Sequence, residues 1–543
     1  VVVENVERNI AMGLSPRDAT IRAMREVTGP IVATLLVLLA VFIPVAFISG
    51  LSGQFYRQFA VTISVSVFIS TINSLTLSPA LAKLLLKGHD QPKDALTRGI
   101  DGLLGWFFVL FNRGFRAFTA IYIKLVAVLV RHLKSVVLIL YAVLIGVAVY
   151  LFIMTPTGFV PAQDKQYLIG FAQLQDGATL DRTEKVIHQM SEIAMKEPGV
   201  QNAVAFPGLS INGFTISSSA GIVFLPMKSF EERRSPDLSA FAIAGKLNQK
   251  FASIPDAFIA IFPPPAVMGL GTVGGFKLQI QDRAAKGYDA LNKVTQDILT
   301  KAYQTPALAG VFSGYKITSP QLQVDVDPDK VKQLGLSLTD VYQTMQIYLG
   351  SLYINDFNQF GHTYQVIAQA DAPYRAYAQD ILNLKARNAY NEMVPLGSVV
   401  KVSESYGPES VVRYNSYPAA DINAGPAPGF SSGQAQQAML EILDNTLPQG
   451  FTFEWTDLVY QQILAGDTMF LIFPLCVFLV FLVLAAQYES LSLPVAVIMI
   501  VPMCLLCAIF GVWVTKNDNN IFTQISFFVL VDLASKNAIL IVA

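Results

Sequence analysis

Six long apolar segments constrain the fold of this chain more than any other feature of its sequence. Each has about 20 residues or more, enough for a helix to cross a bilayer, and they cover approximately residues 29–49, 59–86, 135–154, 468–487, 494–514 and 520–543. Charged residues make up only 14% of the sequence, whereas a soluble domain typically has about 25%. These features predict a membrane-embedded bundle of α-helices.

A polar region of about 310 residues, 155–467, separates the third apolar segment from the fourth, and it is too long to be a loop. Lys and Arg are concentrated before the first segment and between the second and third. By the positive-inside rule these parts are cytoplasmic and the large polar region is periplasmic. Residues 110–132 alternate aromatic and basic side chains, which favours an amphipathic helix on the inner membrane surface. A core helix of a small cytoplasmic domain is the alternative.

The polar region shows a repeated pattern of strands and helices. Strand patterns at 167–173, 200–206, 221–227 and 257–262 alternate with helical patterns at 182–196 and 238–251 in the order β-α-β-β-α-β. This order is typical of a ferredoxin-like α+β unit. A second copy begins at 276–281, 287–302 and 321–326 and resumes at 411–423, 433–444 and 451–455. The residues between its halves, about 349–406, are predicted to be an inserted contact module.

The last apolar segment carries two ionisable side chains, Asp532 and Lys536. Their spacing of four places both on one face of a helix. A charged side chain inside a bilayer costs several kcal/mol or more, so such residues are candidates for a proton relay or an ion path. The alternative is a lysine that extends to the membrane surface from near the end of its helix.

Other chemistries find little support in the sequence. We find no phosphate-binding loop and no arrangement of Ser, His and Asp that indicates an enzyme. The four histidines are scattered at His89, His132, His188 and His362, so we expect no metal site. The net charge of −1 gives no indication of nucleic-acid binding. We therefore expect no cofactor, and an ion gradient as the energy source.

Eight motifs, in order along the chain, resemble a known family. They are VVVENVERNIAMGLSPRDATIRAMREVTGPIVA, AVFIPVAFISGLSGQFYRQFAVTI, NSLTLSPALAKLL, TPTGFVPAQDKQYLI, GSLYINDFNQFGHTYQV, AAQYESLSLP, NDNNIFTQI and ASKNAILIV. They are spread from residue 1 to residue 542, so the resemblance extends over essentially the whole sequence. The chain resembles the inner-membrane pumps of the resistance–nodulation–division (RND) superfamily, and most closely its hydrophobe/amphiphile (multidrug) efflux branch.

This resemblance implies a bacterial inner-membrane, multi-pass protein that exchanges protons for hydrophobic or amphiphilic drugs. It implies a homotrimer that joins a periplasmic adaptor protein and an outer-membrane channel. The sequence is then a fragment, from the end of transmembrane helix four to helix ten. The implied domains are 1–28 (helix end and cytoplasmic connector), 29–86 (two transmembrane helices), 87–134 (cytoplasmic amphipathic segment), 135–154 (transmembrane helix), 155–265 (first porter subdomain), 266–348 and 409–467 (second porter subdomain), 349–408 (docking subdomain) and 468–543 (three transmembrane helices).

The resemblance assigns a role to the charged pair. Lys536 matches the relay lysine of the family's helix ten, with Asn537 beside it, and the partners expected for it lie outside this sequence. Asp532 stands where the family usually has Gly. We hypothesise that Asp532 pairs with Lys536 and so competes with the partners that lie outside this sequence. A damaged or inactive sequence, or an Asp532 that faces a water-filled gap, are the alternatives.

The resemblance also predicts a drug pocket. Residues 207–220 match a loop that separates two drug pockets in the family, although their composition alone indicates a mobile hairpin loop. The residues expected to line the pocket are Ile169, Phe171, Val204, Phe206, Leu209, Ile211, Phe214, Phe224 and Phe262. Any one of these could instead be a core residue. Phe312 stands where some relatives have an Arg, which argues against anionic drugs.

The motif at 350–366 matches the docking segment of the family. Tyr353 and Phe357 are predicted to be contact aromatics, together with Phe360, while Asn355 and Asp356 are predicted to form a turn. Other functions remain open: an RND-type exporter of lipids, metals or proteins, or an inactive membrane-anchored periplasmic binding module.

Overall fold

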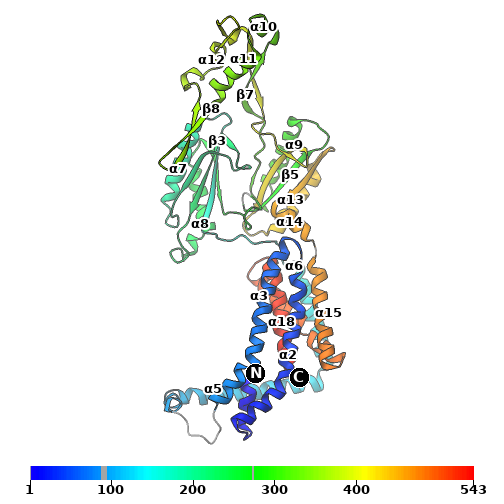
Figure 1. Ribbon diagram of the computed structural model, residues 1–543. Coiled ribbons are helices and arrows are strands. Elements are labelled where there is room, and N and C mark those ends of the chain that lie inside the picture. The colour runs from blue at the N-terminus through cyan, green and yellow to red at the C-terminus, as the bar shows by residue number, and fades with distance from the viewer. Residues whose placement is uncertain (1, 87–94, 272–273, 467, 543) are drawn as a thin grey trace.

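The molecule has three parts stacked along one axis in the computed structural model (Figure 1). The structure describes residues 2–86, 95–271, 274–466 and 468–542, with side chains except for 95–104, 468–470 and 540. A helical bundle forms one end, two units built on β-sheets form the middle, and a smaller unit forms the other end (Figure 1).

Five helical segments of the bundle are long and apolar enough to cross a membrane. They are α2 (Pro16–Ala46), α3 with α4 (Gly50–Leu75 and Leu77–Leu85), α6 (Lys134–Met154), α15 (Thr468–Tyr488) and α16 with α17 (Ser492–Ile498 and Val501–Val514). The expected sixth span is also a helix, α18 (Ile521–Val542), which packs against α2, α3, α16 and α17. It is not among the five, and it is the one that carries Asp532 and Lys536.

The helix boundaries at the first hairpin of the bundle differ from the prediction. The apolar segments predicted at 29–49 and 59–86 imply a polar link over about residues 51–58, but α3 already begins at Gly50 and the link is shorter. Tyr56 lies in this first part of α3, and its hydroxyl donates a hydrogen bond of 2.7 Å to Gln524 Oε1 of α18. The Tyr56 hydroxyl, in a stretch that looks like a loop in the sequence, is thus satisfied across a helix interface.

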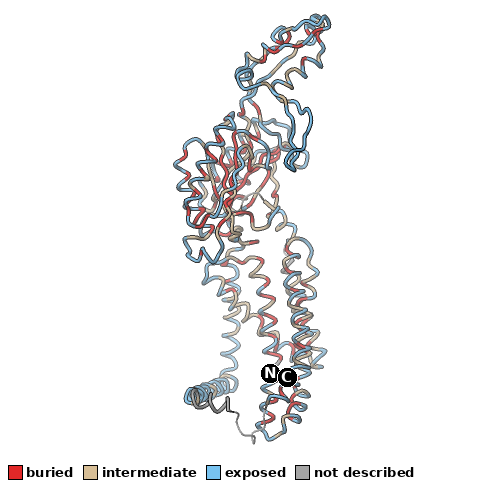
Figure 2. Tube along the Cα trace, turned by 60° about the vertical axis from the view of Figure 1, so that its left-hand side comes forward, coloured by how far each residue is buried: buried red, intermediate tan, exposed pale blue. Residues whose placement is uncertain are grey.

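Two helices lie at the end of the bundle that is distant from the sheets. Helix α1 (Val2–Ala11) packs against α2 and α4. Helix α5 (Ala95–His132) runs across the ends of the long helices (Figures 1 and 2). None of its described side chains is buried. The predicted amphipathic helix is therefore present, and it leaves its aromatic side chains without protein cover.

The first sheet unit contains β1 (Tyr167–Leu174), α7 (Leu180–Met195), β2 (Val204–Leu209), β3 (Ile216–Pro226), α8 (Ala240–Phe251) and β4 (Ala257–Phe262). Its antiparallel sheet has the order β2-β3-β1-β4. Leu168 and Ala172 of β1 face a core shared with α7 and α8. Ile169 and Phe171 belong to a second apolar cluster, because successive strand residues point to opposite faces. Both faces of β1 are therefore apolar.

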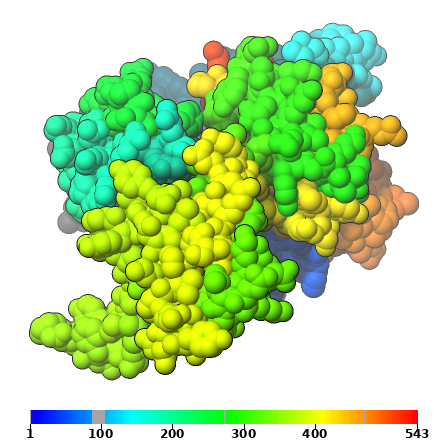
Figure 3. Space-filling view, turned by 90° about the horizontal axis from the view of Figure 1, so that it is seen from above, coloured from blue at the N-terminus to red at the C-terminus, as the bar shows by residue number. Residues whose placement is uncertain are grey.

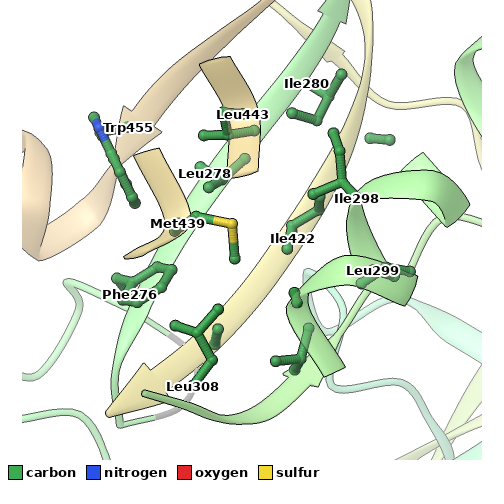
Figure 4. Close-up of a cluster of buried hydrophobic side chains, with 14 of the residues drawn as sticks. Phe276, Leu278, Ile280, Ile298, Leu299, Leu308, Ile422, Met439, Leu443 and Trp455 are labelled. Atoms are coloured by element: carbon green, nitrogen blue, oxygen red, sulfur yellow. The ribbon is translucent and has the colours of Figure 1, made fainter. Parts of the chain in front are cut away.

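The second sheet unit has the order β13-β14-β5-β15, with β6 also paired to β14. Its elements are β5 (Phe276–Asp282), α9 (Tyr288–Tyr303), β6 (Leu308–Phe312), β13 (Arg413–Tyr414), β14 (Tyr417–Pro426), α13 (Ser432–Thr446) and β15 (Phe451–Thr456). Leu278 and Ile280 of β5 pack with Ile298 of α9 and with Met439 and Leu443 of α13 (Figure 4). Helix α14 (Asp457–Ala465) follows the sheet and precedes α15 of the bundle.

A long two-stranded ribbon connects the second sheet unit to the inserted unit. Its strands are β7 (Ser319–Val326) and β12 (Val400–Gly407). The sequence correctly predicted a strand at 321–326 but placed it in the second sheet, where β6 lies instead. Between the ribbon strands lie α10 (Pro328–Gln333), α11 (Leu338–Met345), β8 (Leu352–Gln359), β9 (His362–Ala368), α12 (Ala378–Asn383), β10 (Lys385–Arg387) and β11 (Met393–Pro395). Seen from above, this unit, yellow-green to yellow, extends past the outline of the sheet units (Figure 3).

Candidate functional site

An aromatic cluster lies between the two sheet units. The ring of Phe171, on β1, lies 5.8 Å from that of Phe262 and 5.9 Å from that of Phe258, both on β4. It lies 5.2 Å from the ring of Phe312, which comes from β6 of the second unit. Aromatic rings at such separations attract each other by about 0.5–1.5 kcal/mol beyond their burial. The cluster therefore joins the two units through side chains that could also stack on a ligand.

Most of the predicted pocket residues gather around this cluster. Ile169, Phe171 and Ile211 are buried in one apolar group, and Leu209, Phe224 and Phe262 pack against it. Val204, Phe206 and Phe214 are exposed at 45%, 42% and 52% and lie outside that group. Phe206 still contacts Phe224, with ring centroids 5.8 Å apart.

A cavity of about 100 Å³ opens beside the aromatic cluster, and we call it the inter-unit pocket. Phe171 and Ile211 are the predicted residues that line it. Its other lining residues are Gln173, Ser210, Asn212, Thr215, Ile216, Ser217, Phe258, Phe312, Ser313, Gly314, Lys316, Glu409 and Ser410. The sequence placed five of these in the predicted loop over 207–220 and singled out Phe312 for its effect on drug charge, but it named none of them as a pocket-lining residue. The alternation of Phe258, Ala260 and Phe262 in β4 could have revealed Phe258.

The loop between β2 and β3 forms one wall of this pocket. Its base closes through a hydrogen bond of 2.8 Å from the Ser210 amide to the Thr215 carbonyl. At its tip, Gly213 and Phe214 have φ angles of 66° and 54°. Asn212 packs against Gly314 so closely that a Cβ at Gly314 would overlap its side chain. The loop thus rests directly on the second sheet unit.

A buried carboxylate, that of Asp421, stabilises the backbone at Gly314 that the loop contacts. Asp421, on β14, accepts hydrogen bonds of 3.2 Å from the Gly314 amide and 2.6 Å from Asn423 Nδ2. Burial raises the pKa of Asp421, and the nearby Lys277 and these hydrogen bonds only partly oppose that effect. Asp421 therefore fixes the backbone on which the loop rests.

An ion pair joins the two units at the edge of the pocket. Lys316 Nζ lies 2.8 Å from Asp176 Oδ1, and Thr318 donates a hydrogen bond of 2.7 Å to the other oxygen of this carboxylate. Burial alone would raise the pKa of Asp176, but the contacts with Lys316 and Thr318 outweigh it and hold the pKa below its usual range. The carboxylate is thus ionised and neutralises Lys316.

A second cavity, of about 360 Å³, lies within the bundle, and we call it the bundle cavity. Asp532 and Lys536 of α18 line it together with five hydroxyl side chains, Thr34, Ser70, Thr71, Ser74 and Ser78. Asp532 is only 5% exposed, and its Oδ1 has no hydrogen-bond partner among the described residues. No ion pair joins it to Lys536 within the described chain, and Lys536 and Asn537 are exposed. The two ionisable groups thus line one cavity without forming an ion pair with each other.

The predicted docking residues lie on an exposed hairpin. Tyr353, Asn355, Asp356 and Phe357 all belong to β8, in which every residue is exposed. The prediction that Asn355 and Asp356 form the turn was wrong. The turn is Phe360–Gly361, whose φ angles of 52° and 77° are those of a tight hairpin. Phe357 instead pairs across the hairpin with Tyr364, with ring centroids 5.5 Å apart.

The fold and the two cavities together define a class: a multi-pass membrane protein with a large α+β region built on its bundle. The whole chain, residues 1–543, matches the model of the AcrB/AcrD/AcrF family, and the chain belongs to this family of RND transporters.

Several curated relatives are multidrug or solvent pumps by name. The chain is 36% identical over 546 residues to the multidrug/solvent efflux pump membrane transporter MepB of Pseudomonas putida, covering 100% of this chain and 51% of the relative. It is 35% identical over 551 residues to the multidrug export protein AcrF of Escherichia coli (strain K12), covering 100% and 52%. The chain thus spans about half the length of the curated relatives it matches.

Proposed function

We propose that this chain is part of a pump that expels hydrophobic or amphiphilic molecules from the periplasm and inner membrane toward an outer-membrane channel. The aromatic cluster at the inter-unit pocket carries this proposal. Phe171, Phe258 and Phe312 offer ring faces that bind apolar ligands by area and stacking, without fixed hydrogen bonds. The names of the relatives as multidrug and solvent efflux pumps support it.

The pocket is small in the present conformation. Its 100 Å³ lies below the range of about 300–1,000 Å³ typical of small-molecule sites. The loop over 207–220 forms part of its wall, with Ile211 among the lining residues, so movement of this loop would admit a larger ligand. Leu209 and Phe214 belong to the same stretch but do not line the pocket in this conformation. A wall that repacks around different ligands suits a transporter of broad specificity.

We further propose that the bundle couples this transport to proton entry through Lys536, Asp532 and Asn537. A lysine inside a bundle requires a carboxylate partner, and protonation of the partner would release it. Such a switch can shift helices and so drive the sheet units. The five hydroxyl side chains of the bundle cavity support this role, because they could hold water beside Asp532. Under this proposal Asp532 competes for Lys536 with the carboxylate partners that lie outside this sequence. Replacing Asp532 with Gly in the complete protein therefore raises transport.

The first sheet unit, the inserted unit and helix α5 would connect the pump to its partners and to the membrane. The strand order β2-β3-β1-β4 supports a ferredoxin-like porter subdomain, and the inserted unit would be the docking subdomain. The exposed aromatic side chains Tyr353 and Phe357 on β8 suit contacts in a homotrimer or with a channel or adaptor. Helix α5 would lie on the cytoplasmic face of the inner membrane, in contact with lipid.

Dye efflux by cells tests the proposal. Bacteria that lack their own multidrug pumps would be given the complete gene that encodes this chain, loaded with a lipophilic dye and energised. We expect efflux that exceeds the empty-vector control and stops when a protonophore collapses the proton gradient. Efflux equal to the control would contradict drug transport, and efflux that survives the protonophore would contradict proton coupling. An inactive binding module would give the first of these results.

A further inference from the structure

The charges around the inter-unit pocket are unbalanced. Lys316 is the one cationic side chain among its lining residues, and the charge of Lys316 is already neutralised by Asp176 at 2.8 Å. Both side chains are largely buried, with exposed fractions of 26% and 17%. An anionic ligand would have to displace Asp176 from Lys316 and leave that carboxylate without its partner, which is costly at a partly buried site.

Glu409 provides the opposite charge. It lines the same pocket from the segment between β12 and β13, and its side chain is exposed. No residue in the described part of the chain forms an ion pair with it. The pocket therefore presents one uncompensated carboxylate beside a wall of phenylalanine rings.

We propose that Glu409 determines the charge preference of the inter-unit pocket, which selects aromatic organic cations over anions of the same shape. The rings of Phe171, Phe258 and Phe312 supply stacking surface, and the negative faces of aromatic rings also attract cations. Glu409 adds Coulomb attraction for a cation and repulsion for an anion. This inference rests on the proposed function of the pocket as a drug site.

Two probes of equal shape and opposite charge test it: tetraphenylphosphonium, a monocation, and tetraphenylborate, a monoanion. Both are larger than the pocket, so both require the same movement of the loop and differ only in charge. Equilibrium dialysis would measure the Kd of each for the purified protein, produced from its complete gene in a neutral detergent. Empty micelles would correct for partition into detergent.

The expected result concerns the ratio of the two Kd values. Glu409→Gln weakens tetraphenylphosphonium binding about two- to fivefold, the range of exposed ion pairs, and leaves tetraphenylborate unchanged or bound more tightly. Glu404→Gln, an exposed glutamate on the neighbouring strand β12 that does not line the pocket, leaves both Kd values unchanged.

A third variant separates the two proposals. Phe312→Ala removes a ring of the wall and weakens both probes together if the pocket binds them. Phe312→Ala could weaken the binding of both probes while Glu409→Gln leaves the ratio of the two Kd values unchanged. That result would show that the pocket binds the probes but that Glu409 does not select their charge. If Phe312→Ala affects neither probe, the pocket itself, and the inference with it, is wrong.

Discussion

At the scale of single residues, buried ionic groups divide into those with partners and those without. Arg233, whose side chain is 1% exposed, contacts Asp164 through two hydrogen bonds of 3.0 and 3.1 Å. Asp164 also accepts from the amides of Ala240 and Gln166. This pair ties the segment before β1 to the start of α8. Asp532, in contrast, has an oxygen with no such partner among the described residues.

Asp164→Asn is expected to destabilise the first sheet unit by about 3–5 kcal/mol, since it leaves Arg233 buried without its counter-charge. Burial alone would raise the pKa of Asp164, but the hydrogen bonds from Arg233 and the two amides hold it below its usual range. The stabilisation is therefore present above the unfolded pKa and is lost as pH falls through the folded pKa. Hydrogen exchange of β1 amides at pH 7 measures the loss. Asp297→Asn, on an exposed part of α9, is the control; equal exchange in both variants would refute the prediction.

Asp421→Asn is expected to act in the opposite direction with pH. Burial raises the pKa of Asp421 in the folded protein, so the stability linked to its protonated form is complete below the unfolded pKa. It is lost as pH rises through the folded pKa, by roughly 1.4 kcal/mol for each unit by which the two pKa values differ. The variant should gain thermal stability relative to the wild type between pH 4 and pH 8. Fluorescence of Trp455, 8% exposed in the same unit, reports unfolding. A difference that does not change with pH would show that Asp421 has no raised pKa.

The sequence indicated some of the functionally important charged residues but not others. Asp532 and Lys536 stand out by their charge in an apolar run, and the structure places both at one cavity. Asp421 and Glu409 gave no signal, because an acidic residue in a soluble region is ordinarily exposed. Their roles depend on Gly314, Lys316 and Asp176, which are distant in sequence.

At the scale of elements, the loop between β2 and β3 depends on a glycine of the other sheet unit. Gly314 allows Asn212 to pack where a Cβ would stand. The interface thus requires a residue without a side chain at this position.

Gly314→Ala is expected to displace Asn212 and release the loop from the second sheet unit. Amides of residues 210–217 should then exchange hydrogen about tenfold faster or more, a change that corresponds to about 1.4 kcal/mol of lost local stability. Mass spectrometry of peptides covering the loop measures the exchange. Gly245→Ala, at an open position in α8, is the control. Unchanged exchange in the Gly314 variant would show that the contact does not hold the loop.

Regular elements followed from the sequence more reliably than their pairing. Helices α7, α9 and α13 and strands β1, β4 and β5 lie close to where periodicity placed them. The prediction that placed β7 in the second sheet was wrong. A strand pattern shows which residues alternate between two faces, but it does not show which strand they pair with. The turn of the hairpin was missed because Phe360 is not a typical turn residue, although Gly361 is.

At the scale of the whole molecule, the two cavities lie in separate parts of the stack. The inter-unit pocket is built by the sheet units, and the bundle cavity by α2, α3, α4 and α18 together with Val2 and Val3. Helix α14 connects the parts directly, since it contacts β5 and β15 of the second sheet as well as α3 of the bundle. A movement of α3 at the bundle cavity could therefore reach the sheet that carries Phe312. Sequence patterns gave the order of these parts, but the contact between them needed the structure.

The most direct test of this account is the initial rate of dye efflux by Lys536→Ala in the complete protein. In the proposed mechanism, proton entry through Lys536 at the bundle cavity drives transport. We therefore predict that Lys536→Ala reduces the rate of dye efflux to that of cells without the pump, while the amount of protein in the membrane is unchanged. Lys83→Ala, which removes a lysine of α4 that does not line the bundle cavity, should retain wild-type efflux. Wild-type efflux by Lys536→Ala would contradict the account, since transport would then proceed without the residue through which protons are proposed to drive it.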